Sequence, residues 1–246
     1  MTGVENINPY SGDSRGKKEQ VAAMFDAIAP AYDFMNRAMS FGLDRLWLKA
    51  LLREVRRSRP HRVVDLATGT GDVAFAIASA LPDVTVEGID ISEGMLAKAR
   101  ERASASPSGT RLTFRCADGT ATGIAPDSAD AVTIAYGIRN FADIEGGYRE
   151  MHRILRKGGT LAVLELSKPV NPLVRPFYAF YTRCLIPLAG RIVSGDSRAY
   201  SYLPESIAAA PAGEDMTAIM KRAGFAGATF RRLSFGVCTL YTATKE

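Results

Sequence analysis

The sequence has few cysteines and histidines, and this scarcity excludes several kinds of chemistry. Its 246 residues include three cysteines and two histidines. Cys116, Cys184 and Cys238 are far apart in the chain, so they form neither a disulfide framework nor a metal-binding pattern. With only His61 and His152 available, zinc sites and Ser-His catalysis lose most of their candidates, and we predict no metal site.

Long apolar runs and a strong charge of one sign are also missing. The longest stretch without a charged residue is the twelve residues from Leu233 to Thr244, whereas a membrane-spanning helix needs roughly 18 apolar residues in a row. The N-terminus lacks an apolar signal core, so we expect a cytoplasmic protein. A net charge of +5 favours anionic surfaces but is too mild to indicate nucleic-acid binding.

What is present fits one globular α/β domain. Apolar residues make up 47% of the chain and charged residues 23%, which excludes a wholly disordered protein. We therefore predict a single domain over residues 1–246, with a loose arm over 1–16, a helical cap over about 17–55 and a lid-like insertion over about 169–204. The cap is predicted from 3-4 spacing of apolar residues such as Val21, Met24 and Ile28, which Pro30 interrupts.

After Pro60, short apolar runs alternate with helical segments, as in βαβ units. The last two strands are separated by three residues, which is too short for a parallel crossover and predicts an antiparallel hairpin. The sequence thus predicts an open, doubly wound, mostly parallel sheet of seven strands. The predicted strands are 62–67, 84–91, 112–117, 131–136, 160–166, 228–233 and 237–244, and the predicted helices are 72–80, 93–103, 144–155 and 214–223, with a turn at Gly158-Gly159.

The insertion and the cap are rich in apolar residues. We expect most of these side chains to pack on the core or to form a lid, while a basic, aromatic helix can also lie in a membrane interface. Membrane contact is therefore a secondary role that we consider for a few of these residues. The residues concerned are Met24, Phe25, Phe34, Met35, Met39 and Phe41 in the cap, and Arg175, Phe177, Tyr178, Phe180, Tyr181, Arg183, Leu185, Ile186, Leu188 and Arg191 in the insertion.

A glycine-containing loop lies between the first predicted strand and the first predicted helix of the sheet. Gly69 and Gly71 would let backbone N–H groups approach a ligand at a helix N-terminus. Alone, such a loop is weak evidence, because it can be a tight turn that binds nothing. Asp90, however, ends the next strand, 19 residues after Gly71 (90 − 71 = 19). A carboxylate at that position can accept hydrogen bonds from ribose hydroxyls. Asp90 could also cap the following helix, but loop and acid together predict a nucleoside ligand.

The position of Asp65 helps to distinguish a dinucleotide from a nucleoside that carries an amino group. It lies four residues before Gly69, where a dinucleotide would bring its anionic pyrophosphate and an α-amino group would be attracted. We therefore predict S-adenosyl-L-methionine as the cofactor, with an NAD-dependent oxidoreductase as the alternative. Asp118 and Gly119, just after the third strand, are further cofactor candidates, since Asp118 could accept the adenine amino group. Taken alone, Asp118 would be read as a turn residue.

The fourth strand runs into Tyr136-Gly137-Ile138-Arg139-Asn140-Phe141, in the crevice where open α/β sheets bind ligands. Arg139 supplies positive charge there, and Asn140 supplies a donor and an acceptor. A structural pairing of Arg139 with an acid such as Asp143 is equally consistent with the sequence. Glu165, the only acid in the fifth strand, is either a supporting residue or a site residue. The segment lacks the Asn/Asp-Pro-Pro-aromatic element associated with methylation of nucleic-acid bases.

From Lys17 to its end, the chain resembles the UbiE/MenG family of quinone-biosynthesis C-methyltransferases. The glycine loop is generic to the fold, whereas the first and third motifs and the Ser-Lys-Pro segment are specific to the family. Asp44, Ala135 and Lys157 depart from the family's usual residues without disturbing the resemblance. The motifs that carry it are Tyr32 to Asn36 with Ser40 to Trp47, Asp65 to Asp72, Tyr136 to Asn140, Arg153 to Gly159, Leu164 to Pro169, Tyr200 to Ile207 and Ala223 to Phe225.

The resemblance implies a class I S-adenosylmethionine-dependent methyltransferase fold and a polyprenylated quinol substrate. It adds Thr70 to the cofactor-binding candidates, alongside Asp90, Asp118 and Gly119. The expected reaction is methylation of a ring carbon, first of demethylmenaquinol, with the 2-methoxy-6-polyprenyl-1,4-benzoquinol of ubiquinone synthesis, or both, as the alternative. Arg139 is predicted to stabilise the quinol anion, with Asn140 and Tyr32 positioning the hydroxyl. A peripheral place at the inner face of the membrane and a homodimer are options that the sequence leaves open.

Overall fold

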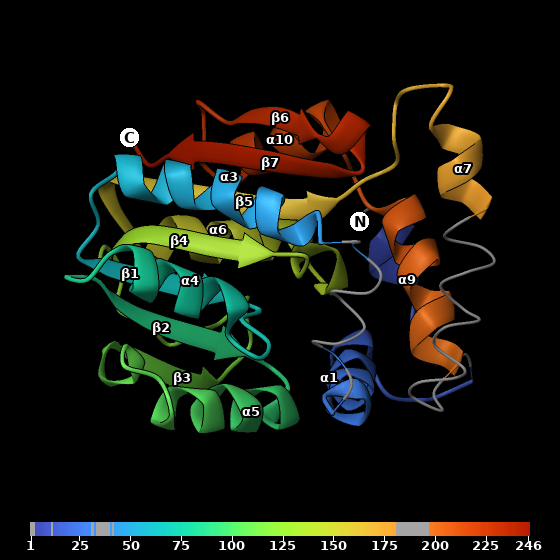
Figure 1. The fold of residues 1–246 in the computed structure, drawn as a ribbon. Helices are drawn as coiled ribbons and strands as arrows, with labels where there is room; N and C mark the ends of the chain where they lie inside the picture. The colour runs from blue at the N-terminus through green and yellow to red at the C-terminus, as the bar shows by residue number, and fades with distance from the viewer. Residues whose placement is uncertain (1–2, 11, 31, 33–39, 41, 181–196) are drawn as a thin grey trace.

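The strands of the chain form one mixed sheet (Figure 1). The computed structural model describes residues 3–10, 12–30, 32, 40, 42–180 and 197–246, and in these ranges seven strands lie in the order β3-β2-β1-β4-β5-β7-β6. Among these strands β7 alone runs opposite to the other six, so the predicted doubly wound sheet with a C-terminal hairpin is confirmed. The strands are β1 (Arg62–Leu66), β2 (Thr85–Asp90), β3 (Leu112–Cys116), β4 (Ala129–Ala135), β5 (Leu155–Leu166), β6 (Thr229–Leu233) and β7 (Cys238–Thr244).

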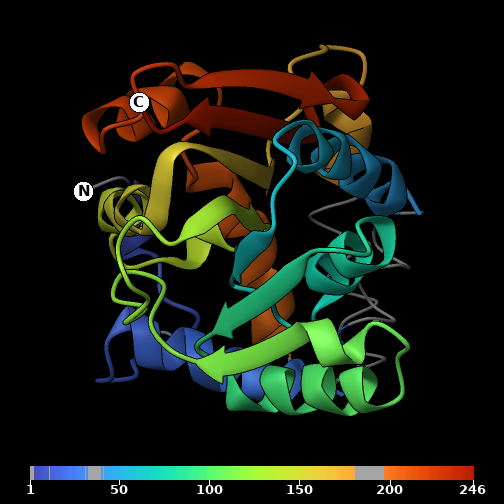
Figure 2. The ribbon, with the colours of Figure 1, turned by 90° about the vertical axis from the view of Figure 1, so that its left-hand side faces the viewer.

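Helices cover both faces of the sheet (Figures 1 and 2). One buried cluster joins the sheet to α3 and α4, and a second joins it to α6 and α10. Val63 belongs to the first cluster and Val64 to the second, as expected when successive strand residues point to opposite faces. The helices are α1 (Lys17–Ile28), α3 (Asp44–Arg57), α4 (Asp72–Ala80), α5 (Glu93–Ser104), α6 (Ile144–Ile154), α7 (Arg175–Phe180), α9 (Ser197–Ala209) and α10 (Glu214–Arg222).

The predicted turn at Gly158-Gly159 is wrong. The helix ends at Ile154, and β5 begins at once with Leu155, which pairs with Ala129 of β4. The glycines lie inside the strand, where the register with β4 shifts, and Gly158 has φ +76°. A glycine with positive φ inside a strand marks a bulge, which a sequence pattern cannot distinguish from a turn.

The predicted loose arm over residues 1–16 is also wrong for its first described residues, 3–6, while 7–10 and 12–16 have no regular secondary structure. Gly3–Asn6 forms a short 3-10 helix (η1), and Val4 is fully buried in the cluster beneath α6. Glu5 accepts a hydrogen bond from the Ile144 backbone N–H at 2.8 Å, at the start of α6. Lys17 Nζ donates to the Val4 carbonyl oxygen at 2.5 Å. Long-range contacts therefore order a segment whose composition resembles that of a loop.

Helix α1 of the cap and helices α7 and α9 lie beyond the carboxyl ends of the strands, on the right in Figure 1, whereas α3 of the cap packs on a face of the sheet. Helix α1 begins and ends as its apolar spacing predicts, and Asp26 accepts hydrogen bonds from Ser92 Oγ and the Gly94 N–H at the start of α5. Cap residues 33–36, 39 and 41 and the insertion residues from 181 to 196 lie outside the described residues. No helix in the described ranges is long and apolar enough to cross a membrane.

Candidate active-site cleft

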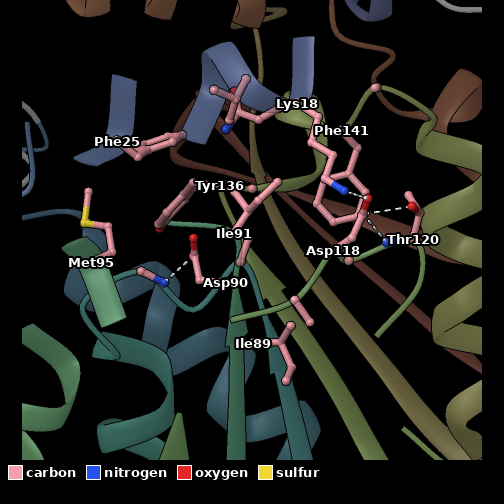
Figure 3. Close-up of a pocket in the computed structure, with 18 of the residues that line it drawn as sticks. Lys18, Phe25, Ile89, Asp90, Ile91, Met95, Asp118, Thr120, Tyr136 and Phe141 are labelled. Carbon is pink, nitrogen blue, oxygen red and sulfur yellow. Dashed lines mark hydrogen bonds and ion pairs between the residues drawn. The ribbon is translucent and has the colours of Figure 1, made fainter. Parts of the chain in front are cut away.

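A cleft opens at the carboxyl ends of β1, β2 and β4, with α1 across it (Figure 3). It encloses about 880 Å³ of empty space, solvent at its mouth included. Six predicted site residues line it: Tyr32, Gly69, Asp90, Asp118, Gly119 and Asn140. Asp65, Thr70, Gly71 and Arg139 do not line it, although they lie in the segments that shape its walls.

The loop after β1 has the backbone geometry that its glycines predict. Gly69 has φ +56° and Gly71 has φ +91°, a left-handed conformation that side chains disfavour. A Cβ on Gly71 would also lie 2.9 Å from the Phe75 ring. Thr70 is buried, and its carbonyl oxygen accepts a hydrogen bond from Arg102 at 2.7 Å. Thr70 and Gly71 thus shape the loop, and Gly69 is the glycine that reaches the cleft.

Two other residues with positive φ stand at this edge of the sheet. Ala67 (φ +49°) follows β1 and Tyr136 (φ +59°) follows β4. Between them, Gly137 brings the two loops together, because a Cβ there would lie 2.4 Å from the Ala67 Cβ. Strained backbone outside glycine tends to occur at functional sites, where the surrounding fold holds it in place. Both loops line the cleft.

Asp65 lies beneath the loop, not in the cleft. Its two oxygens accept hydrogen bonds from Thr68 Oγ1 and Thr133 Oγ1, each at 2.6 Å. Burial raises the pKa of Asp65 from 3.8 to about 7, although the two hydroxyls act to lower it. The carboxyl group therefore supports the loop through Thr68 and reaches a ligand only through its neighbours.

Asp90 does face the cleft, where Figure 3 shows it beside the glycine loop. Its Oδ2 accepts the Gly69 N–H at 2.8 Å, and its Oδ1 accepts the Ser92 N–H at 2.9 Å. Burial raises the pKa of Asp90 against the lowering effect of these backbone donors. A carboxylate has about four lone-pair positions, so Asp90 retains acceptor capacity for a ligand. Ser92 caps α5 by accepting the Met95 N–H, so capping falls to Ser92.

Asp118 stands on the opposite wall of the cleft and pairs with a residue that the sequence analysis missed. Lys18 Nζ, on α1, lies 2.8 Å from Asp118 Oδ2, and the Thr120 N–H and hydroxyl donate to Oδ1 (Figure 3). Burial would raise the pKa of Asp118, but Lys18 and Thr120 together lower it. Gly119 lets the Phe141 ring approach, since a Cβ there would lie 2.3 Å from it. The ion pair holds α1 against the cleft.

Arg139 is buried behind the cleft in an ion pair with Glu165. Its Nη1 lies 2.6 Å from Glu165 Oε1 and also donates to the Tyr136 carbonyl oxygen. The backbone N–H of Arg139 donates to Glu165 Oε2 at 3.2 Å. Burial alone would lower the pKa of Arg139, but the Glu165 carboxylate holds it above its usual value. The pairing partner is thus Glu165. Asp143, the acid considered from the sequence, caps α6 by accepting the Gly146 N–H.

Asn140 connects the cleft to the insertion. Its Oδ1 accepts a hydrogen bond from the Tyr202 hydroxyl, on α9, at 3.1 Å. Burial raises the pKa of Tyr202 to about 12, although Arg139 acts to lower it. Tyr32 lines the same cleft. Tyr202 belongs to the family motif from Tyr200 to Ile207, but no local sequence pattern predicts that it contacts Asn140, 62 residues away.

The arrangement suits binding more than metal chemistry. Within the described ranges, no three His, Cys, Asp or Glu side chains are grouped as a metal site would require. One wall of the cleft carries the glycine loop and Asp90, and the other carries Asn140 in front of the Arg139–Glu165 pair. Such a cleft can hold a nucleoside beside a second, partly polar molecule.

Curated relatives match nearly the whole chain. A demethylmenaquinone methyltransferase of Bacteroides fragilis is 44% identical over 241 residues, covering 98% of each chain. A protein of Geobacter sulfurreducens named ubiquinone/menaquinone biosynthesis C-methyltransferase UbiE is 42% identical over 230 residues, covering 93% of this chain and 90% of the relative.

Solved structures share the fold at low sequence identity. The [4+2]-cyclase SpnF has a TM-score of 0.70 at 19% identity, over 96% of this chain and 99% of its own. A phosphoethanolamine N-methyltransferase of Haemonchus contortus, in complex with S-adenosyl-L-methionine, has a TM-score of 0.59 at 18% identity, over 87% of this chain and 59% of its own. A cyclase and a methyltransferase on one fold show that the fold alone does not define the reaction.

The model of the ubiE/COQ5 methyltransferase family matches residues 13–245. The match spans the glycine loop, the Arg139 segment and the final hairpin, and the relatives agree with it over nearly full length. The predicted reaction class is thereby confirmed, and the NAD-dependent alternative is excluded. The chain belongs to the ubiE/COQ5 methyltransferase family.

Proposed function

We propose that this protein transfers the methyl group of S-adenosylmethionine to a ring carbon of a polyprenylated quinol, with demethylmenaquinol as the acceptor. The observation that carries the proposal is the cleft itself, in a chain of this family. It combines a nucleoside-type wall, formed by Gly69 and Asp90, with the Arg139–Glu165 pair and Asn140 on the other side. The names of the relatives supply the acceptor class.

The residues present fit the cofactor. Asp90 faces the cleft with acceptor capacity for ribose hydroxyls, and the Gly69 backbone permits close approach. Asp118 would accept the adenine amino group once Lys18 shares or leaves it. Thr70, Gly71 and Asp65 would act by shaping and supporting the loop, and Gly119 by admitting the Phe141 ring. When bound, S-adenosylmethionine supplies an electrophilic methyl group on a good leaving group.

The protein then has to orient the quinol, exclude water and favour its anion. A phenolic hydroxyl has a pKa of about 10, and a neighbouring guanidinium lowers it by stabilising the anion. Negative charge on the oxygen spreads to the adjacent ring carbon, which bonds to the methyl group as the sulfur–methyl bond breaks. That ring carbon then loses its proton to solvent, and the ring becomes aromatic again. Arg139 lies buried behind the cleft wall, with its Nε–H unpartnered among the described residues, and would act on the quinol oxygen through its positive charge. Asn140 and Tyr32, which line the cleft, would position the ring.

We also propose how the chain is organised around the cleft and where in the cell it acts. We place the chain as one domain over 1–246, with the cap over about 17–55 and the insertion over about 169–204 closing the cleft. The Tyr202–Asn140 hydrogen bond and the Lys18–Asp118 pair support this, because they tie α9 and α1 to the cleft. A tailed quinol resides in a bilayer, so we further propose a cytoplasmic protein that acts peripherally at the inner membrane face.

The deciding experiment is a methyl-transfer assay with labelled S-adenosylmethionine in detergent. Reduced demethylmenaquinol and 2-methoxy-6-polyprenyl-1,4-benzoquinol are offered side by side. Turnover of demethylmenaquinol is expected, and turnover of both would extend the activity to ubiquinone synthesis. Cofactor binding without methylation of either quinol would contradict the proposal and leave a binding module that is not an enzyme.

The role of Arg139 is tested by separating its charge from its contribution to stability. Arg139→Gln leaves Glu165 buried and unpaired, which costs roughly 3–5 kcal/mol of folding free energy. The double variant Arg139→Gln, Glu165→Gln removes both charges and is expected to recover much of that loss. Turnover should fall at least about 100-fold in both variants, while cofactor affinity, measured by calorimetry, changes little. Near-normal turnover in the stable double variant would contradict the role of Arg139.

A further inference from the structure

The described part of the chain exposes five large apolar side chains. Leu173 is 78% exposed, Phe235 70% and Leu46 57%, and the other two are Val170 and Leu43. They come from three segments: the start of α3, the loop after β5, and the 3-10 turn η5 (Ser234–Gly236) of the final hairpin. In Figure 1 all three segments lie at the right-hand end, the carboxyl edge of the sheet.

Specific contacts hold the three segments together. The Trp47 Nε1–H donates to Ser234 Oγ at 2.8 Å, which fixes α3 against η5. The Ser167 hydroxyl donates to the Gly236 carbonyl oxygen at 2.7 Å, which fixes the loop after β5 against the same turn. A Cβ on Gly236 would lie 3.3 Å from the Val170 backbone nitrogen. The exposed apolar residues therefore belong to one surface, which we call the edge patch: Leu43, Leu46, Val170, Leu173 and Phe235.

Phe235 is held outward at a backbone cost. Its φ of +59° and ψ of 20° are in the left-handed region, which a bulky residue rarely adopts. Strain of this kind persists only where the surrounding structure holds it in place, and it clusters at functional sites. An exposed aromatic ring at the tip of a hairpin is suited to insertion into an apolar phase.

In the segments that carry the edge patch, the charged residues are almost all positive. Across 42–49, 167–176 and 231–237 there are six basic residues and one acid, Asp44. Asp44 is partly buried and accepts a hydrogen bond from Ser40. The basic residues are all exposed: Arg45, Lys49, Lys168, Arg175, Arg231 and Arg232. Exposed apolar groups rimmed by cations match the interface of an anionic bilayer, with its acyl region beneath acidic headgroups.

We propose that the edge patch docks the protein on an anionic lipid bilayer. The inference rests on the proposed function for its purpose, since a polyprenylated quinol must be taken from a bilayer. The geometry agrees, because the loop after β5 follows directly on the strand that carries Glu165, the partner of Arg139. Docking through this edge presents the acceptor side of the cleft to the membrane.

The test is flotation of the full chain with vesicles, without quinol or cofactor. Phosphatidylcholine vesicles with and without phosphatidylglycerol are compared at low and high salt. The triple variant Leu46→Ser, Leu173→Ser, Phe235→Asn removes the apolar groups, and asparagine tolerates the left-handed backbone. The wild type should bind the anionic vesicles in a salt-sensitive manner, and the triple variant should bind about tenfold or more weakly.

A charge-matched pair of variants tests the basic rim. Arg45→Gln, Lys49→Gln, Lys168→Gln should weaken binding severalfold. Arg53→Gln, Arg56→Gln, Lys221→Gln removes the same charge from exposed positions away from the patch and should leave binding nearly unchanged. The circular dichroism spectrum and the melting temperature of the triple apolar variant should match those of the wild type, which shows that the variant is folded.

The inference is overturned if the wild type does not bind anionic vesicles or if the triple variant binds them equally well. It is also overturned if the wild type sediments as a dimer and binds no vesicles, while the triple variant sediments as a monomer. The last would assign the patch to a second copy of the chain. Flotation needs no methyl transfer, so failure of the docking surface and failure of the proposed function are distinguished.

Discussion

Asp65 shows how one buried carboxyl group supports a site that it does not touch. Its hydrogen bonds to Thr68 and Thr133 join the glycine loop to the neighbouring strand β4. Burial raises its pKa to about 7, so the folded state holds a proton on Asp65 at pH values where the unfolded chain has lost it.

This raised pKa predicts a pH dependence of stability. Between about pH 4 and pH 7 the native state binds more protons at this position than the unfolded state, so stability falls as pH rises. The slope is about 1.4 kcal/mol per pH unit for a single group. Asp65→Asn cannot titrate and still offers hydrogen-bonding atoms to both threonines. Relative to this variant, the wild type should lose about 2 kcal/mol between pH 5 and pH 8.

Urea unfolding of both proteins at several pH values, without cofactor, measures the difference. Taking the difference cancels the titration of the other acids. A difference that stays constant with pH would mean that Asp65 ionises at its ordinary pKa and that its burial is compensated in another way.

At the scale of elements, β5 is the strand for which local pattern and structure disagree. It follows α6 without a loop and passes through a glycine pair, with the Gly158 N–H donating to the Lys245 carbonyl oxygen at 2.7 Å. A Cβ on Gly158 would meet no atom within 4 Å, so only its φ of +76° requires glycine. The backbone conformation of one residue thus allows the strand to extend through the bulge.

Gly158→Ala should therefore reduce stability by about 1–2 kcal/mol, the cost of a left-handed conformation for a residue with a Cβ. Gly227→Ala is the matched control, because Gly227 also has open space around it but no positive φ. It should change stability by less than about 0.5 kcal/mol. Urea unfolding compares the two, and equal effects would show that Gly158 does not need its positive φ.

At the scale of the whole molecule, the cleft joins parts of the chain that are distant in sequence. Lys18 from α1, the loops after β1, β2 and β4, and Tyr202 from α9 meet there. A ligand bound in such a place stabilises the whole fold, because the unfolded chain has no site for it.

We expect S-adenosylmethionine to raise the melting temperature, with a stabilisation of about 2.7 kcal/mol when its concentration is 100 times its Kd. Asp90→Asn should remove most of this effect, since it leaves a buried amide in place of the acceptor for ribose. Asp83→Asn makes the same change at an exposed position between α4 and β2 and should keep the effect. Scanning calorimetry measures both. A full shift in Asp90→Asn would remove Asp90 from the cofactor site.

The sequence by itself determined the elements whose signals are local. Apolar spacing predicted α1, the glycine loop predicted α4 from Asp72, and the short link predicted the final hairpin. Six of its predicted site residues line the cleft, since carboxyl ends of parallel strands converge there, whereas Asp65, Thr70, Gly71 and Arg139 do not. The motifs predicted the family, which the comparisons confirmed.

Only the tertiary structure decided which partner each charged or polar side chain has. It paired Arg139 with Glu165, Asp118 with Lys18 and Asn140 with Tyr202, and it ordered the N-terminal segment through Val4 and Glu5. These contacts join residues far apart in the chain, and burial then raises or lowers their pKa values. No local pattern encodes them, because a hydrogen bond or an ion pair depends on distance in space, which the packing of the whole chain sets.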